Sequence, residues 1–291
     1  MAHTQDGDIP QESARDWVGQ NAAVECPDVP LDEGCAEDLN RTIESEIIPR
    51  LMMLFDQETG GGYGESSAGA PKGMVERVDE FVDLVLRHDA KVASEFISRL
   101  RSAGVSLQTI YLDLLAPSAR RLGSLWESDE VSFTMVTIAV ARMHQVLLQF
   151  SPCFCAAAGE DVDSHHSALI VPVPGEQHTF GLFMTVEFFR RGGWNVWSGT
   201  PDGASELMEL VRNNHFDIIG FSVSSDRHLE ELSNQIREVR IQSCNKDIKV
   251  MVGGRMFAEQ DQLHKEIGAD ASAAAGDEGV RLAESLVSNA D

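Results

Sequence analysis

A carboxylate and an imidazole stand two residues apart in the segment Pro-Gly-Glu-Gln-His-Thr-Phe-Gly, at positions 174–181. This spacing lets Glu176 reach back to one ring nitrogen of His178. That contact fixes the tautomer and leaves the other nitrogen as a basic lone pair for a metal. One His and one Glu are too few for a bare zinc ion, which takes about four protein ligands in a structural site. A single imidazole suits a metal that a macrocycle already holds, such as a corrin or a haem, and Gly181 lets the backbone approach something bulky.

Short apolar runs alternate with segments of helical spacing from residue 167 onward. The apolar runs are 167–173, 194–197, 217–223, 248–254 and, more weakly, 271–275. The helical segments are 179–191, 203–214, 228–243, 257–267 and 277–289. This alternation predicts a flavodoxin-like (Rossmann-like) α/β domain over 167–291, with a parallel five-stranded sheet covered on both faces.

The residues that follow these strands form a candidate site, because ligands of an open parallel sheet bind beyond the carboxyl ends of its strands. Small or polar residues follow the first, third and fourth strands: Glu176, His178, Thr179, Gly181, Ser222, Ser224, Gly253 and Gly254. We expect them to meet at one edge of the sheet. Ordinary turn chemistry at strand ends is the alternative for the serines and glycines.

Residues 74–150 have helical spacing throughout. The pattern predicts four helices, at about 75–88, 90–102, 106–124 and 132–150. One continuous apolar stripe on the last helix consists of Val136, Val140, Met143, Leu147 and Phe150. Short loops between antiparallel helices indicate a small four-helix bundle, with a kink at Pro117, followed by a polar connector over 151–166.

The amino-terminal 1–73 reads as an acidic arm, a helix and a Gly-rich linker. Residues 1–66 hold 15 Asp and Glu against 3 Lys and Arg, a net charge of −12 out of −24 for the whole chain of 291 residues. No cluster of Lys and Arg is present that could bind phosphates, so we expect no direct contact with nucleic acid. No apolar stretch reaches the ~20 residues that span a bilayer and no signal peptide is evident, so we expect no membrane contact and a cytoplasmic location.

Three loop motifs together resemble the cobalamin-binding domains of methionine synthase, corrinoid carrier proteins and B12 photoreceptors. They are Glu176-Gln177-His178-Thr179-Phe180-Gly181, then Ser222-Val223-Ser224, then Gly253-Gly254. The resemblance implies cobalamin, as adenosylcobalamin or hydroxocobalamin, bound base-off with His178 as the lower cobalt ligand and Glu176 orienting it. It also implies that the nucleotide tail enters the sheet between the Ser222 and Gly253-Gly254 loops. Glu176 stands where this family usually has Asp.

The helical region extends the resemblance. Pro117, Gly123 and Trp126 have the spacing P-x5-G-x2-W of the helical cap that precedes corrinoid domains. In the photoreceptors this Trp covers the upper face of the corrin, a role that the resemblance implies for Trp126; a core aromatic of the bundle is the alternative. Glu127 replaces the His that follows the Trp in those proteins. An upper cobalt ligand would therefore come from elsewhere, with His144 as a candidate.

The chain most resembles the AerR/PpaA-type antirepressors of photosynthetic bacteria. That resemblance implies a light-responsive transcriptional regulator that acts through a DNA-binding repressor protein of photosynthesis genes. No Ser-His-Asp set, G-x4-G-K phosphate loop or paired carboxylates are evident, so we expect no catalytic residues and no enzymatic activity. Two alternatives remain open: a corrinoid methyl-carrier protein of a methyltransferase system, and a haem-binding redox or light sensor.

Overall fold

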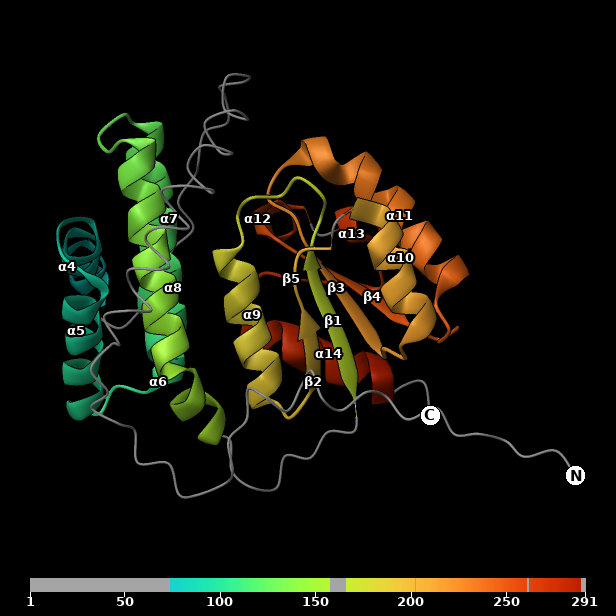
Figure 1. Ribbon diagram of the computed structural model, residues 1–291, viewed down its shortest axis with the longest axis horizontal. Coiled ribbons are helices and arrows are strands. Elements are labelled where there is room, and N and C mark those ends of the chain that lie inside the picture. The colour runs from blue at the N-terminus through green and yellow to red at the C-terminus, as the bar shows by residue number, and fades with distance from the viewer. Residues whose placement is uncertain (1–73, 158–165, 202, 261, 289–291) are drawn as a thin grey trace, which may run out of the picture. The chain divides into compact units, whose positions relative to one another are not determined.

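The structure is a computed structural model that describes residues 74–157, 166–201, 203–260 and 262–288 (Figure 1). The predicted arm, helix and linker over 1–73 lie outside the described residues. So do positions 158–165 of the predicted connector.

A bundle of helices occupies the first described range. Its elements are α4 (Met74–Arg87), α5 (Ala90–Ser102), α6 (Leu107–Ile110), the π-helical turn η2 (Tyr111–Leu115), α7 (Ala116–Glu127) and α8 (Phe133–Ala156). The side chains of Asp89, Ser106 and Ser132 accept hydrogen bonds from the first turns of α5, α6 and α8, respectively. Such side chains satisfy backbone N–H groups that have no partner within the helix, which explains where these helices begin.

The third predicted helix contains a π-helical turn just before Pro117. The backbone N–H of Ala116 donates to the carbonyl of Tyr111, five residues earlier. Proline has no N–H to donate and disrupts the regular pattern of hydrogen bonds around it. The wider turn accommodates that disruption, so the chain continues as α7 beyond the position where we expected a kink.

Helix α8 continues six residues beyond its expected end at 150 and passes through Pro152. Apolar packing accounts for the extension. Phe154 is fully buried, and its ring stacks on Tyr111 at a centroid distance of 4.4 Å. The segment taken as the start of a polar connector is therefore the last part of a core helix.

Among the described helices, α8 is also long and apolar enough to cross a membrane, by length and composition alone. Met143, Val146 and Leu147 of α8 are nonetheless buried in the bundle core. Arg142 donates to the carbonyls of Val85, at 2.7 Å, and Leu86 on α4. In the described part of the chain, α8 packs as the central helix of the bundle.

The five predicted strands form one parallel sheet, as expected. They are β1 (Ser167–Pro172), β2 (Asn195–Ser198), β3 (Ile218–Ser222), β4 (Lys249–Gly253) and β5 (Ala271–Ala273), in the spatial order β2-β1-β3-β4-β5. This is the strand order of flavodoxin-like folds. The order reverses between β1 and β3, where such sheets bind their ligands.

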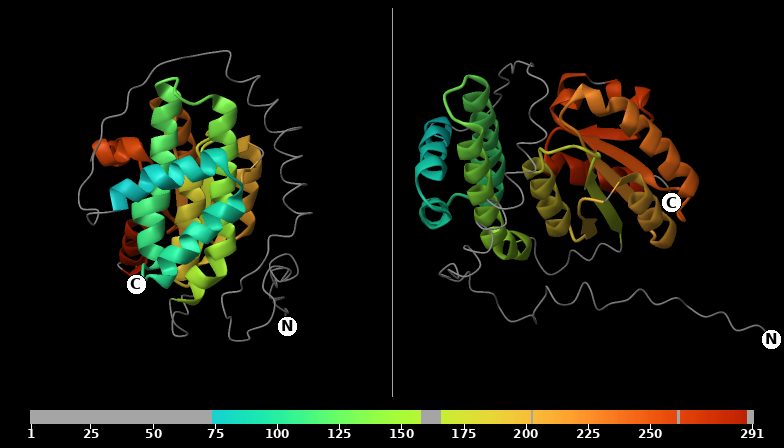
Figure 2. Two further views of the ribbon diagram at one scale, coloured as in Figure 1. Left: turned by 90° about the vertical axis from the view of Figure 1, so that its left-hand side faces the viewer. Right: turned by 45° about the horizontal axis from the view of Figure 1, so that its top comes forward.

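Helices cover both faces of the sheet (Figure 1). One face packs against α10 (Gly203–Asn213), α11 (Leu229–Gln242), α12 (Arg255–Glu259) and α13 (Leu263–Glu266). The other face packs against α9 (Phe180–Arg191) and α14 (Gly276–Ser288), as a second view also shows (Figure 2). Side chains alternate along β1, so Leu169 and Val171 point to the first set of helices and Ala168 and Ile170 to the second.

Helix α9 contributes to two hydrophobic cores. Three of its residues, at helical spacing, belong to the core of the bundle: Phe180, Met184 and Phe188. Three others belong to the core between α9, α14 and the sheet: Leu182, Val186 and Phe189. The same helix is therefore an inner element of both parts of the molecule.

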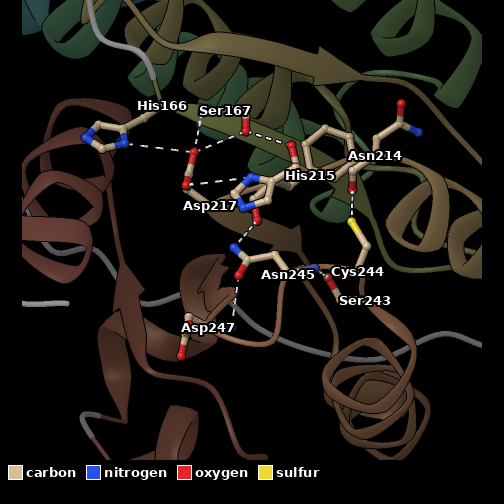
Figure 3. Close-up of polar contacts among 10 residues, drawn as sticks. His166, Ser167, Asn214, His215, Asp217, Ser243, Cys244, Asn245 and Asp247 are labelled. Atoms are coloured by element: carbon tan, nitrogen blue, oxygen red, sulfur yellow. Dashed lines mark hydrogen bonds and ion pairs between the residues drawn. The ribbon is translucent and has the colours of Figure 1, made fainter. Parts of the chain in front are cut away.

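A polar network joins the amino ends of β1 and β3, away from the loops at their carboxyl ends (Figure 3). The carboxylate of Asp217 accepts hydrogen bonds from the backbone N–H of Ser167 at 2.7 Å and from its hydroxyl at 3.1 Å. The imidazoles of His166 and His215 each lie 3.9 Å from an oxygen of the same carboxylate. The network fixes the point at which the chain enters the sheet.

Candidate functional site

The loops after β1 and β3 bring Glu176, His178 and Ser224 into direct contact. Oε1 of Glu176 lies 2.8 Å from Nδ1 of His178 and also accepts a 2.8 Å hydrogen bond from its backbone N–H. Oε2 accepts hydrogen bonds from the backbone N–H and the hydroxyl of Ser224, both at 2.6 Å. The Ser224 hydroxyl is in turn 2.8 Å from Nδ1 of His178. One carboxylate thus connects the two loops and orients the imidazole, as the spacing predicted for Glu176.

The Glu176 carboxylate is ionised at neutral pH, although its side chain is only 2% exposed. Burial by itself would raise its pKa. Hydrogen bonds from the side chains and backbone N–H groups of His178 and Ser224 outweigh that effect and lower the pKa to about 2. A charged acceptor next to Nδ1 keeps the ring proton on that nitrogen.

The other ring nitrogen of His178, Nε2, is therefore the one available to a ligand. The contacts of the imidazole with Glu176 and Ser224 are all made at Nδ1, while the side chain as a whole is 67% exposed. Nε2 then carries the lone pair, oriented by a carboxylate behind the ring. A histidine held in this way is prepared to bind a metal that a cofactor holds.

The donor set fits a metal held by a macrocycle. In the described ranges, no group of three or more His, Cys, Asp or Glu residues is arranged to hold a metal ion. His178 can thus supply one axial ligand but no complete coordination shell. Gly181 follows it, and a Cβ atom built there would meet no heavy atom within 4 Å, so the backbone is open on that side.

The glycines after β4 allow a close approach between two loops. Gly254 has φ +142°, and a Cβ atom there would lie 1.8 Å from the carbonyl oxygen of Val223. No other residue fits this position. Gly253 pairs with Ser222 across β3 and β4, and its carbonyl accepts a hydrogen bond from Val223 at 3.0 Å. Ser222, Gly253 and Gly254 therefore meet at the same edge as His178.

Trp126 and Thr179 stand at the ends of two helices, in the last turn of α7 and directly before α9, respectively. Trp126 is in the last turn of α7, with its ring 6.0 Å from that of Phe133. Burial raises the pKa of the next residue, Glu127, and the charges of Arg255 and His178 only partly oppose that rise, so the end of α7 is within electrostatic reach of the site. Thr179 stands directly before α9, and its carbonyl accepts a hydrogen bond from the first turn.

His144 lies on α8 in contact with α9, and no described contact joins it to Glu176, His178 or Ser224. Its ring is 5.1 Å from Phe180 and 4.9 Å from Phe183, centroid to centroid. Neither these aromatic contacts nor the place of Arg255 near the site was predicted from the sequence. The position of Arg255 directly after Gly254 was the one available signal for it.

Two family models match the chain, and both are described as B12 binding domain. One matches residues 166–283, the α/β part, and the other matches residues 77–149, the helical part. Each of the two parts is therefore similar to a B12 binding domain. This result supports the cobalamin site that the resemblance implied.

Two relatives and one solved structure are also similar to this chain. The chain is 28% identical over 170 residues to an uncharacterised 20.5 kDa protein in the bchF-crtJ intergenic region of Rhodobacter capsulatus, covering 58% of this chain and 88% of the relative. It is 22% identical over 211 residues to a corrinoid protein of Desulfitobacterium hafniense (strain Y51), covering 72% of this chain and 97% of the relative. The monomethylamine corrinoid protein of Methanosarcina barkeri has a similar fold, with a TM-score of 0.62, 17% identity and coverage of 73% and 99% of the two chains.

Proposed function

We propose that this protein binds cobalamin base-off, with Nε2 of His178 as the lower axial ligand of cobalt. The observation that carries the proposal is the contact network in which Glu176 and Ser224 both hold Nδ1 of His178. Bound cobalamin would supply a cobalt–carbon bond that light can break. The chain's own part would be to bind, orient and enclose it, with the nucleotide tail entering between the loop of Ser222 and the loop of Gly253 and Gly254.

The test is absorption spectroscopy and equilibrium binding with adenosylcobalamin and hydroxocobalamin. His178→Ala should abolish or sharply weaken binding, because the cobalt loses its lower protein ligand. His215→Ala is the matched control, since His215 is an exposed histidine at the opposite ends of the strands and should leave both readouts unchanged. The ligand assignment fails if His178→Ala binds as tightly as the parent protein and gives the same spectrum.

We further propose that the protein is a soluble, cytoplasmic, light-responsive regulator of the AerR/PpaA antirepressor type. Its partner would be a DNA-binding repressor of photosynthesis genes, with no direct contact to nucleic acid or membrane. A net charge of −24 supports an indirect route to DNA, because phosphates repel such a chain. The Rhodobacter capsulatus relative in the bchF-crtJ intergenic region also supports this assignment.

Capture of the purified repressor by the cobalamin-loaded protein tests the regulatory role, in darkness and after illumination. We expect a difference in captured repressor between the two states, because a ligand shifts a conformational balance only by its differential affinity for the two conformations. Equal capture in both states would count against the light response.

A corrinoid methyl carrier without catalytic residues of its own is the second candidate. The similarity to the Desulfitobacterium hafniense corrinoid protein favours it, and both functions would use His178. Methyl transfer from the loaded protein to an added methyltransferase and acceptor, without light-dependent repressor capture, would establish the carrier function. A haem sensor remains a third proposal, which loading with haem in place of cobalamin would test.

A further inference from the structure

His144 occupies an aromatic slot between the bundle and the first turn of α9. Phe180 is the first residue of that helix, and its ring is tilted 52° against the imidazole at 5.1 Å. Phe183, one turn later, meets the imidazole edge-on at 4.9 Å. Among the described residues, the buried Nε2 of His144 has no hydrogen-bond partner. The ring therefore acts through packing.

We propose that His144 is a positioning residue for His178. By filling the slot between Phe180 and Phe183, it fixes the first turn of α9 against the bundle and thereby sets the place of the imidazole two residues before that helix. This inference rests on the proposed function, in which His178 binds cobalt. It assigns His144 a structural role behind the site, in place of the upper cobalt ligand that we considered from the sequence.

The surroundings of His144 support a neutral ring that packs between two aromatic side chains. Burial lowers the pKa of His144 to about 4, so the imidazole is uncharged at neutral pH and behaves as a flat aromatic group. Phe180 is 7% exposed and belongs to the bundle core, together with Met184 and Phe188 farther along α9. Movement of α8 would therefore displace the first turn of α9, which follows the proposed metal ligand His178.

Toward the bundle, the first turn of α9 has few other anchors, because Leu182 packs on the side of the sheet. Gly181 contributes no side chain, and a Cβ atom there would meet nothing within 4 Å. Thr179, directly before α9, makes no side-chain cap bond to the helix. The buried Phe180 and the 40% exposed Phe183 are thus the side chains of this turn that face the bundle, and both contact His144.

Three variants separate packing from ligation. His144→Ala empties the slot, so we expect about tenfold weaker cobalamin binding and a spectrum with less of the His178-bound form, as for residues that orient a ligand. His144→Phe fills the slot without a ring nitrogen and should keep the parent affinity and spectrum. Met143→Ala is the matched control, because Met143 is a fully buried neighbour on α8 that belongs to the bundle core. It should lower stability without changing the spectrum.

Amide hydrogen exchange of residues 178–184 in the cofactor-free protein gives an independent readout. Exchange there should be faster in His144→Ala than in the parent, His144→Phe or Met143→Ala proteins. Unchanged exchange, affinity and spectrum in His144→Ala would overturn the proposal. A changed spectrum in His144→Phe would identify His144 as a cobalt ligand instead. If the proposed function is wrong, the parent protein itself will bind no cobalamin. The exchange measurement uses the cofactor-free protein, so it still tests the packing role of His144.

Discussion

The longer side chain of Glu176 still holds His178, because it turns back on its own loop. The same oxygen that meets Nδ1 also accepts the backbone N–H of His178, so the loop and the ring are fixed together. The second oxygen is occupied by two donors from Ser224. Charged acceptors strengthen such hydrogen bonds, which is why a nearly buried carboxylate can stay ionised here.

Weakening this network should weaken cofactor binding in a graded way. Glu176→Gln keeps an oxygen for the ring but removes the charge, and we expect a loss of affinity of about 10–100-fold. Ser224→Ala removes the hydroxyl and leaves the backbone N–H on Glu176, so its loss should be smaller, about tenfold or less. Titration of each variant with hydroxocobalamin measures this order. A larger loss of hydroxocobalamin affinity in Ser224→Ala than in Glu176→Gln would contradict this order.

Gly254 allows a prediction about stability. Gly254→Ala would force a side chain into the carbonyl of Val223 at a positive φ, so we expect the free energy of unfolding to fall by about 3 kcal/mol or more. In Gly253→Ala the new Cβ would lie 3.5 Å from the carbonyl oxygen of Ala273, an ordinary contact. Urea unfolding of both cofactor-free variants measures the difference. Equal losses would mean that the loops after β3 and β4 are not as close as described.

At the scale of secondary structure, α9 is the element with the most consequences. It follows the metal-binding loop directly, and its opposite sides lie in different cores. Few helices of an α/β domain face anything but the sheet and solvent. Here α8 covers the second face of α9. A conformational change in the metal-binding loop therefore affects the packing of both cores.

The two faces of α9 can be tested with a matched pair of substitutions. Met184 is 5% exposed and faces the bundle, whereas Leu182 is 4% exposed and faces the sheet. Met184→Ala and Leu182→Ala should each cost about 2–5 kcal/mol of stability. Amide exchange should rise mainly in α8 for the first variant and mainly in β1 and α14 for the second. The same exchange pattern in both variants would refute the division of the helix between two cores.

Strand positions were accessible from the sequence, because buried parallel strands are short apolar runs separated by helical spacing. β1, β3 and β4 lie within one residue of their expected limits. The contacts of Glu176 with His178 also followed from their spacing. Periodicity identifies an apolar face but not the partner that covers it, so the second partner of α9 and the extension of α8 through Pro152 could not be deduced.

Charge is the property of the whole molecule that bears most on its action. The net charge of −24 means that association with DNA would bring like charges together. We expect the loaded protein alone to leave the mobility of promoter DNA unchanged at physiological salt, in darkness and in light. With the repressor added, the shifted band should depend on illumination. A direct shift by this protein alone would contradict the proposed route through a partner.

The shared helix also limits how these two regions can be recombined. A cut in the connector after α8 would leave Phe180, Met184 and Phe188 uncovered on one fragment and their counterparts uncovered on the other. Large exposed apolar patches promote self-association. Transferring the cofactor-binding region into another protein would therefore require that α8 be included. Otherwise a new helix would have to be designed to cover Phe180, Met184 and Phe188.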